Sequence, residues 1–252
     1  FKFYLTNQNM KRKLTLISFL LVVFNGNAQI ADSTSLVKSQ SKLSYKQFIV
    51  PTVLIGGGFL LKESTLNKNL QKDAQKIFGS DFQTQIDNVI PFIPIAQIYG
   101  GMFLGFVLKS DWQHQTVNIF VSNVITYTIV ESMKHSFKEI RPDSSDNFSF
   151  PSGHTALAFT NASLLYYEYK NTNIWYASSG FLFATATGIL RIANNKHYLS
   201  DVLTGSGIGI GVGLIVSYWN PFGSLTFGKN KTHALLYPQV GKHYGMGLIL
   251  YR

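Results

Sequence analysis

Uncharged, largely apolar stretches make up most of the second half of the chain. Five segments between residues 89 and 228 contain no Asp, Glu, Lys or Arg, and two of their separators are only three residues long. Such stretches are typical of helices buried on most of their surface, and short separators make adjacent helices antiparallel neighbours. The pattern predicts an all-α antiparallel bundle of about five or six core helices. The five segments are Val89–Leu108, Trp112–Val130, Phe148–Tyr167, Asn171–Leu190 and Val202–Gly228.

The residues ahead of this bundle follow a different pattern. Gln47–Leu61 is uncharged, but it spans only 15 residues and contains Pro51 and three consecutive glycines. We therefore expect a half-buried or interfacial helix there instead of a membrane span. Lys62–Asp87 is charged and amphipathic, which predicts a solvated helix with a break at Gly79-Ser80.

The C-terminal end of the chain becomes strand-like. Ala234–Tyr237 and Met246–Tyr251 flank a turn region near Gly241, and this arrangement predicts a terminal hairpin. The alternate glycines from Gly205 to Gly213 look superficially like a nucleotide-binding loop, but no strand precedes them. Close packing of helices through small residues is the better interpretation.

The first residues have the pattern of a bacterial secretory signal. Met10 is followed by three basic residues, an apolar stretch from Leu14 to Phe24 and small residues up to Ala28, after which we expect cleavage. An uncleaved anchor helix is the alternative, although this apolar stretch is short for a bilayer span. The predicted division of the chain is a leader over 1–28, a lead-in with two helices over 29–88, the helical bundle over 89–219 and a tail over 220–252.

Composition narrows the classes of function. The 252 residues are 46% hydrophobic and 13% charged, and they include no Cys, which excludes disulfide scaffolds, zinc ribbons and thiol catalysis. The net charge is +10, but four of the basic residues belong to the leader and the rest are dispersed. We therefore expect no nucleic-acid partner, whereas an anionic substrate or a membrane surface fits.

The conspicuous ionisable residues of the second half lie at boundaries between the uncharged segments. In an antiparallel bundle, alternate boundaries share one face, so these residues are predicted to converge. They are Lys134 and Arg141, the run Pro151-Ser152-Gly153-His154, and Arg191, His197 and Asp201.

This set of side chains suits phosphate chemistry. Three cations at one place would repel each other unless a multiply charged anion lies between them, and arginine matches phosphate oxygens in a bidentate way. The helix start at Ser152 and Gly153 would add backbone N–H donors. Asp201, one helical turn from His197, could orient that imidazole as a nucleophile, while His154 could protonate a departing oxygen. A facial metal triad of the two His and Asp201 is an alternative that the surrounding cations oppose.

Three short patterns of this region resemble known motifs. In chain order they are Lys-x6-Arg-Pro from Lys134, Pro-Ser-Gly-His from Pro151 and Arg-x5-His-x3-Asp from Arg191. The motifs that they resemble are the signature motifs of the type 2 phosphatidic acid phosphatase and vanadium haloperoxidase superfamily, and the resemblance covers about Val130 to Tyr218. One position departs from the family pattern, because Leu190 stands where the family usually has Ser. That departure puts one hydroxyl contact to the phosphate in doubt.

The resemblance implies a metal-independent phosphatase without a cofactor that hydrolyses phosphate monoesters or diphosphates of lipids through a phosphohistidine intermediate. His197 would attack phosphorus, Asp201 would hold its ring, and His154 would protonate the leaving group. A soluble periplasmic acid phosphatase, a vanadate-dependent haloperoxidase and a noncatalytic phospholipid-binding protein are the alternatives. The residues implied in phosphate binding are Lys134, Arg141, Ser152, Gly153 and Arg191.

The leader and the bundle together predict a location. If the leader is cleaved and Gln47–Leu61 does not span, the segment at Val89 enters from outside and the motifs face the periplasm. We therefore expect five spans in a bacterial inner membrane, with a lipid phosphate or a polyprenyl diphosphate as substrate. A wholly soluble periplasmic bundle is the alternative.

The other histidines and acidic residues of this half are expected to be structural. Asp143 and Asp146, with Ser144 and Ser145, suit turn chemistry in the loop that leads to Phe150. The histidines without organised partners in the sequence are His114, His135, His233 and His243.

Overall fold

The computed structural model describes residues 43–79, 81–219, 233–239 and 245–251. The predicted leader and its cleavage after Ala28 lie outside the described residues. Seven helices and one hairpin are present in the described part: α2 Ile49–Lys62, α3 Thr65–Phe78, α4 Ile93–Phe103, α5 Trp112–Phe137, α6 Gly153–Tyr169, α7 Ile174–Ala193, α8 Leu199–Trp219, β1 His233–Gln239 and β2 Gly245–Tyr251. Three short 3₁₀ turns, η1 Tyr45–Phe48, η2 Ile86–Asn88 and η3 Ile90–Phe92, complete the description.

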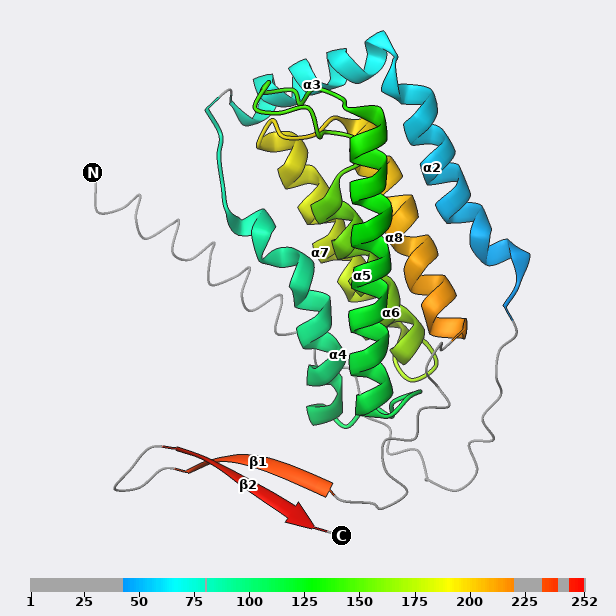
Figure 1. Cartoon of the computed structure of the whole chain (residues 1–252), viewed down its shortest axis with the longest axis vertical. Coiled ribbons are helices and arrows are strands. Elements are labelled where there is room, and N and C mark those ends of the chain that lie inside the picture. Colours follow the sequence, from blue (N-terminus) through cyan, green and yellow to red (C-terminus); the bar gives the residue numbers. More distant parts are fainter. Residues whose placement is uncertain (1–42, 80, 220–232, 240–244, 252) are drawn as a thin grey trace, which may run out of the picture. The chain divides into compact units, whose positions relative to one another are not determined.

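The five uncharged segments form helices α4 to α8, which confirms the predicted all-α bundle. Figure 1 shows α5 to α8 side by side, and α6 packs against α5, α7 and α8. The helix boundaries differ from the uncharged segments at some ends. Helix α5 continues past Val130 to Phe137, since Lys138 provides a left-handed C-cap, and α8 already begins at Leu199.

The terminal hairpin is also confirmed. Strands β1 and β2 pair antiparallel, with His233 opposite Tyr251 and Gln239 opposite Gly245. The predicted turn near Gly241 falls in residues 240–244, outside the described residues.

The glycines of α8 allow two helices to approach it closely. A Cβ atom added at Gly209 would lie 2.3 Å from the carbonyl oxygen of Ala156 in α6, and one at Gly207 would lie 2.7 Å from that of Pro51 in α2. Gly205 and Gly213 face α6 in the same way as Gly209. The interpretation of this glycine run as a helix-packing surface is therefore confirmed.

This packing predicts different effects for two similar substitutions. Gly209→Ala forces α6 and α8 apart and is expected to destabilise the protein by about 1–3 kcal/mol. Gly211→Ala is the control, because its Cβ would meet only the Pro51 Cβ at 3.7 Å, an ordinary contact. Thermal unfolding of the two purified variants measures the difference. A Gly209→Ala protein as stable as the Gly211→Ala protein would contradict the close approach.

Helices α2 and α3 lie where helices were predicted, and α2 is half-buried as expected, whereas the predicted environment of α3 is only partly right. Helix α3 is capped by Ser64, whose hydroxyl accepts from the Asn67 N–H, and it ends at Gly79 with φ 95°. The expected solvated helix is wrong for one face of α3, because Asn67 and Gln71 are buried. The Asn67 amide donates to the Ser200 hydroxyl at 2.8 Å, so the polar face packs against the bundle.

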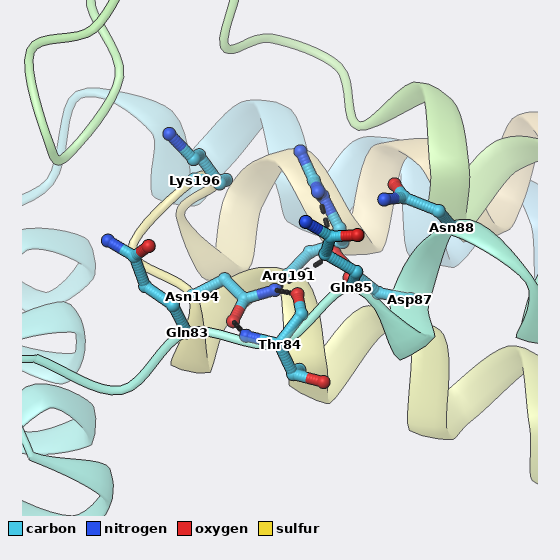
Figure 2. A pocket seen from close by; sticks show the side chains of 8 residues that line it. All are labelled: Gln83, Thr84, Gln85, Asp87, Asn88, Arg191, Asn194 and Lys196. Atoms are coloured by element: carbon cyan, nitrogen blue, oxygen red, sulfur yellow. Dashed lines mark hydrogen bonds and ion pairs between the residues drawn. The ribbon is translucent and has the colours of Figure 1, made fainter.

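The segment before the bundle is fastened to the end of α7. The Asn194 side chain accepts from the Thr84 N–H at 2.9 Å and donates to the Thr84 carbonyl at 2.9 Å, as Figure 2 shows. These two hydrogen bonds hold residues 83–88 beside the C-terminal end of α7.

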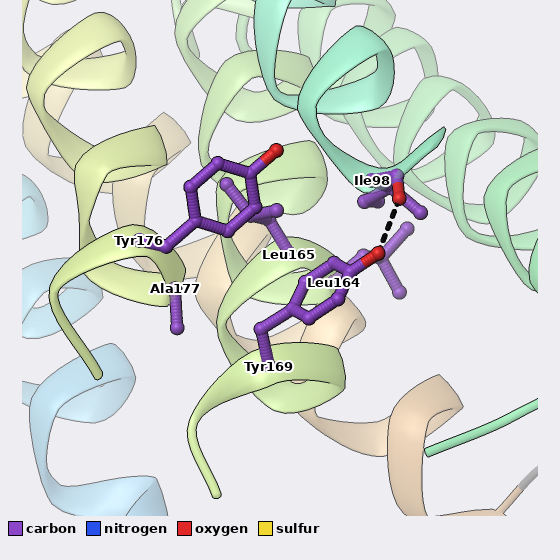
Figure 3. Packing of buried hydrophobic residues seen from close by; sticks show 6 residues of the cluster. All are labelled: Ile98, Leu164, Leu165, Tyr169, Tyr176 and Ala177. Atoms are coloured by element: carbon purple, nitrogen blue, oxygen red, sulfur yellow. Dashed lines mark hydrogen bonds between the residues drawn. The ribbon is translucent and has the colours of Figure 1, made fainter. Parts of the chain in front are cut away.

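Helix α4 is joined to the bundle by an aromatic cluster. The hydroxyl of the buried Tyr169 donates to the Ile98 carbonyl at 2.6 Å, as Figure 3 shows. The Tyr176 hydroxyl donates to the Gln97 carbonyl. Leu164 and Leu165 of α6 pack in the same cluster. The hydrogen bonds that the two tyrosine hydroxyls would make to water are thus replaced by hydrogen bonds to backbone carbonyls of α4.

Helix length and composition support fewer membrane spans than the five predicted. Among the described helices, α8 is long and apolar enough to cross a bilayer, and the bent pair Tyr45–Lys62 with Thr65–Phe78 would add a second if it acts as one broken span. Helix α4 has only 11 residues, and α8 is mostly buried inside the bundle, as the core helix of a soluble protein would also be. The five-span topology is therefore not supported by this measure.

Candidate active site

Four parts of the chain meet at one end of the bundle. A Cβ atom added at Gly153 would lie 3.7 Å from the Lys134 ammonium, so the end of α5 lies beside the start of α6. The Ser152 N–H donates to the Asp201 carbonyl at 3.1 Å, and the Asp143 N–H donates to the Asn195 carbonyl at 3.1 Å. The three groups of residues predicted to converge are thus brought together by backbone contacts.

His197 and Asp201 form a buried pair. His197 lies in the connection between α7 and α8, and its Nδ1 is 3.3 Å from Oδ2 of Asp201 in the first turn of α8. The side chains are 1% and 0% exposed. Asp201 also accepts from the Ser149 hydroxyl at 2.5 Å and from the Tyr198 N–H at 3.0 Å. A carboxylate held this firmly fixes the ring and leaves Nε2 of His197 as the nitrogen with a lone pair.

The electrostatic environment keeps His197 neutral. Burial lowers its pKa from about 6.5 to about 4, although Asp201 acts in the opposite direction. The positive charges of Arg191 and Arg141 lower this pKa further, so both guanidinium groups act on the ring. A neutral imidazole surrounded by cations can act as a nucleophile toward an anion at pH 7.

We expected that only an anionic ligand would balance the three cations of the site, and this expectation is wrong. Each is paired with a carboxylate of the chain: Arg191 Nη1 lies 2.6 Å from Asp87 Oδ2, Arg141 Nε 2.7 Å from Asp146 Oδ1, and Lys134 Nζ 3.4 Å from Glu131 Oε1. Each pair leaves other donors of the cation available. The Nε atom of Arg191, for example, is buried and has no partner among the described residues.

The start of α6 contributes less directly than predicted. Ser152 is fully buried, and its hydroxyl hydrogen-bonds to the Thr155 hydroxyl at 2.9 Å. The Ser152 N–H is already donated to the Asp201 carbonyl. Gly153, however, begins the helix beside the Lys134 ammonium, which a Cβ added there would meet at an ordinary contact distance of 3.7 Å.

His154 has a partner that the sequence did not reveal. Its Nε2 lies 3.0 Å from the Asn88 Oδ1. Burial lowers the pKa of His154 to about 4, and the Arg191 charge adds to this effect, while Asp87 opposes it. His154 is therefore neutral at pH 7 in the protein without a ligand.

Sequence analysis missed Asp87, Asn88 and Ser149. Asp87 and Asn88 lie in η2, directly before the first uncharged segment, and this position at a helix boundary was the one available signal. Ser149 is fully buried, its hydroxyl donates to Asp201, and its N–H donates to the Glu139 carbonyl at 2.9 Å. Burial and the nearby Asp201 charge raise the pKa of Glu139 to about 7.

Other residues considered in the sequence have simple roles. Asp143 and Asp146 accept from backbone N–H groups within the loop, as predicted, but each also pairs with a cation, Lys196 and Arg141 respectively. His114 pairs with Asp111, and His135 hydrogen-bonds to the Glu131 carbonyl. The side chains of His233 and His243 are outside the described part. Leu190 supplies no hydroxyl group, and nothing in the structure explains the departure from Ser.

The structure gives no support to the facial-triad alternative. Among the described residues, no group of three or more His, Cys, Asp or Glu is arranged to hold a metal ion. Each imidazole instead has one polar partner, Asp201 for His197 and Asn88 for His154.

A cavity of about 340 Å³ opens beside Arg191, and Figure 2 shows its lining. We call it the polar pocket. Asn88, which contacts His154, is one of its walls, so the pocket adjoins His154. The residues that line it are Gln83, Thr84, Gln85, Asp87, Asn88, Arg191, Asn194 and Lys196.

Two known proteins are similar in sequence to part of the chain. A lipid A 1-phosphatase of Porphyromonas gingivalis is 39% identical over 142 residues, which cover 56% of this chain and 32% of that protein. A PA-phosphatase related-family protein of Dictyostelium discoideum is 26% identical over 172 residues, covering 57% of this chain and 62% of that protein. The chain thus spans less than two thirds of the length of either relative.

A solved structure shares the fold. The transmembrane PAP2 type phosphatidylglycerolphosphate phosphatase of Bacillus subtilis superposes with a TM-score of 0.50 at 17% identity, covering 71% of this chain and 99% of that one. The family model of the PAP2 superfamily matches residues 115–223, a segment that contains all three motifs. The resemblance seen in the sequence is thereby confirmed over this segment, which is similar to the PAP2 superfamily.

Proposed function

We propose that the protein is a phosphatase that hydrolyses phosphate monoesters of lipids through a phosphohistidine intermediate. One observation carries this proposal: a buried, neutral imidazole, oriented by Asp201, lies within the electrostatic reach of Arg191 and Arg141. The similarity to a lipid A 1-phosphatase supports a lipid phosphate as the substrate class.

The first half of the reaction transfers the phosphoryl group to the protein. Nε2 of His197 attacks phosphorus, and the bond from phosphorus to the leaving oxygen breaks. Asp201 stabilises the imidazolium character that develops on the ring. Donors from Arg191, Arg141 and Lys134 stabilise the negative charge on the phosphoryl oxygens as the transition state forms.

His154 would act first as the general acid and then as the general base. A phosphate dianion beside the ring is expected to raise the low pKa of His154, so that substrate binding loads it with the proton that the leaving oxygen receives. In the second half, His154 takes a proton from water while that water attacks the phosphohistidine. Inorganic phosphate leaves, and His197 returns to its neutral state.

The proposed location is a bacterial inner membrane, with the active site at the periplasmic face. The leader pattern of residues 10–28 and the apolar helix α8 support this location. At the outer leaflet the site would meet phosphorylated lipids at the depth of their headgroups.

Phosphate release from a panel of lipids tests the proposed function. We expect the purified protein to release inorganic phosphate from lipid A 1-phosphate or phosphatidic acid in the presence of EDTA, because side-chain cations supply the charge stabilisation. A water-soluble phosphate ester is the control for a nonspecific acid phosphatase. Activity that is lost in EDTA and restored by zinc would contradict the mechanism, and halide oxidation with vanadate and peroxide would indicate a haloperoxidase instead.

A further inference from the structure

We propose that the polar pocket accepts an uncharged, hydrogen-bonding leaving group and discriminates against diphosphates. This inference rests on the proposed phosphatase function and goes further by assigning the substrate class. It makes Asp87 a specificity-determining residue, although Asp87 belongs to none of the three motifs and precedes the segment that the family model matches.

The location of the pocket assigns it to the leaving group. Asn88 lines the pocket, and its Oδ1 is 3.0 Å from the His154 Nε2, the atom that would hand a proton to the leaving oxygen. Arg191, a candidate phosphate-binding residue, lines the same pocket. A phosphoryl group placed at His197 would therefore direct its leaving group past His154 and into this space.

The cations of the pocket are already neutralised. Arg191 pairs with Asp87 at 2.6 Å, and both side chains are nearly inaccessible to solvent, 9% and 1% exposed. Lys196 pairs with Asp143 at 2.5 Å, in a more exposed position. Screening by water weakens the second pair more than the first, so the buried Asp87 has the larger influence on charge in the pocket.

The rest of the lining is neutral and polar. Asn194 is fully engaged with Thr84 and Asp87, so it shapes the wall. Gln83 and Gln85 line the pocket, and their amides can donate to or accept from hydroxyl groups.

A diphosphate would bring additional negative charge into this pocket. Its second phosphate would lie near the Asp87 carboxylate, and the charges of Arg191 and Lys196 are already offset by Asp87 and Asp143. Like charges repel strongly where water is largely excluded. An alcohol leaving group rich in hydroxyls meets no such penalty and finds amide partners.

The test compares lipid A 1-phosphate, whose leaving alcohol is a sugar, with lipid A 1-diphosphate. We expect the wild-type kcat/KM for the monophosphate to exceed that for the diphosphate by about tenfold or more. Asp87→Asn keeps the size and a hydrogen-bonding oxygen beside Arg191 but removes the charge. It should reduce this selectivity by about fivefold, because the Arg191 charge is then no longer offset by a carboxylate and can attract the second phosphate. The ratio cancels any effect that lowers both activities equally.

Two further variants complete the design. Asp73→Asn removes an exposed carboxylate of α3 that pairs with Lys76, and it should leave the ratio unchanged. Asp143→Asn frees Lys196 and should reduce selectivity even if Asp87→Asn fails to fold. Equal or faster hydrolysis of the diphosphate by the wild-type protein, or an unchanged ratio in folded Asp87→Asn, would overturn the inference alone. Absence of phosphate release from every phosphorylated lipid would overturn the proposed function and this inference with it.

Discussion

Replacement of His197 by alanine is expected to reduce phosphate release by about 10⁴-fold or more, because no other group can form the covalent intermediate. The His197 ring is 1% exposed, is held by Asp201 and lies under the positive charge of two arginines. In the described part of the site the other imidazole is that of His154, which is bound to Asn88 and is needed for proton transfer, so it cannot substitute. Phosphate release in a single turnover measures the effect directly, with the covalent phosphoprotein trapped by a rapid quench in alkaline denaturant, where a phosphohistidine is stable.

The control for this prediction is His114→Gln. His114 lies in the first turn of α5, whereas Lys134 of the site lies near the other end of that helix, on the order of 30 Å away. His114→Gln should retain wild-type activity. His197→Asn, which fills more of the buried space than alanine, shows whether a loss of activity comes from a lost nucleophile or from misfolding. Substantial phosphate release by a folded His197→Asn protein would refute the covalent mechanism.

Arg191→Lys is expected to reduce kcat/KM by about 10²-fold or more, although the positive charge is retained. The guanidinium uses one nitrogen to bind Asp87, and its remaining N–H groups are available for phosphoryl oxygens. A lysine ammonium beside Asp87 cannot span both partners in the same geometry. Most of the loss should appear in kcat, because the developing charge of the transition state needs these donors more than the bound substrate does.

Lysine is chosen over alanine for a physical reason. Arg191→Ala would leave the buried Asp87 carboxylate without a cationic partner, which costs about 3–5 kcal/mol and would confuse a folding defect with a catalytic one. Thermal unfolding of Arg191→Lys should stay close to that of the wild type. A variant with full activity would show that Arg191 only neutralises Asp87 and does not act on the phosphoryl group.

The helices were predictable because the information is local. A stretch without charged residues that ends at Lys109–Asp111 or Glu168–Lys170 defines a buried helix and its turn within a short window of sequence. The helix ends were harder to predict, because a helix end depends on a single capping residue such as Asp111 or Lys138. The hydrophobic pattern does not show where such a residue lies. The burial of Asn67 and Gln71 on a polar helix was not predictable, because it depends on distant partners in α7 and α8.

The sequence alone determined the bundle, the terminal hairpin and the three motifs, because spacing along the chain places each motif at a helix end. Only the tertiary structure decided which groups surround those motifs. Asp87 reaches Arg191 across 104 positions, Asn88 reaches His154 across 66, and Ser149 reaches Asp201 across 52. Contacts at such separations depend on how the helices pack, and they set the charge of the site, whereas periodicity and motif spacing describe only neighbours along the chain.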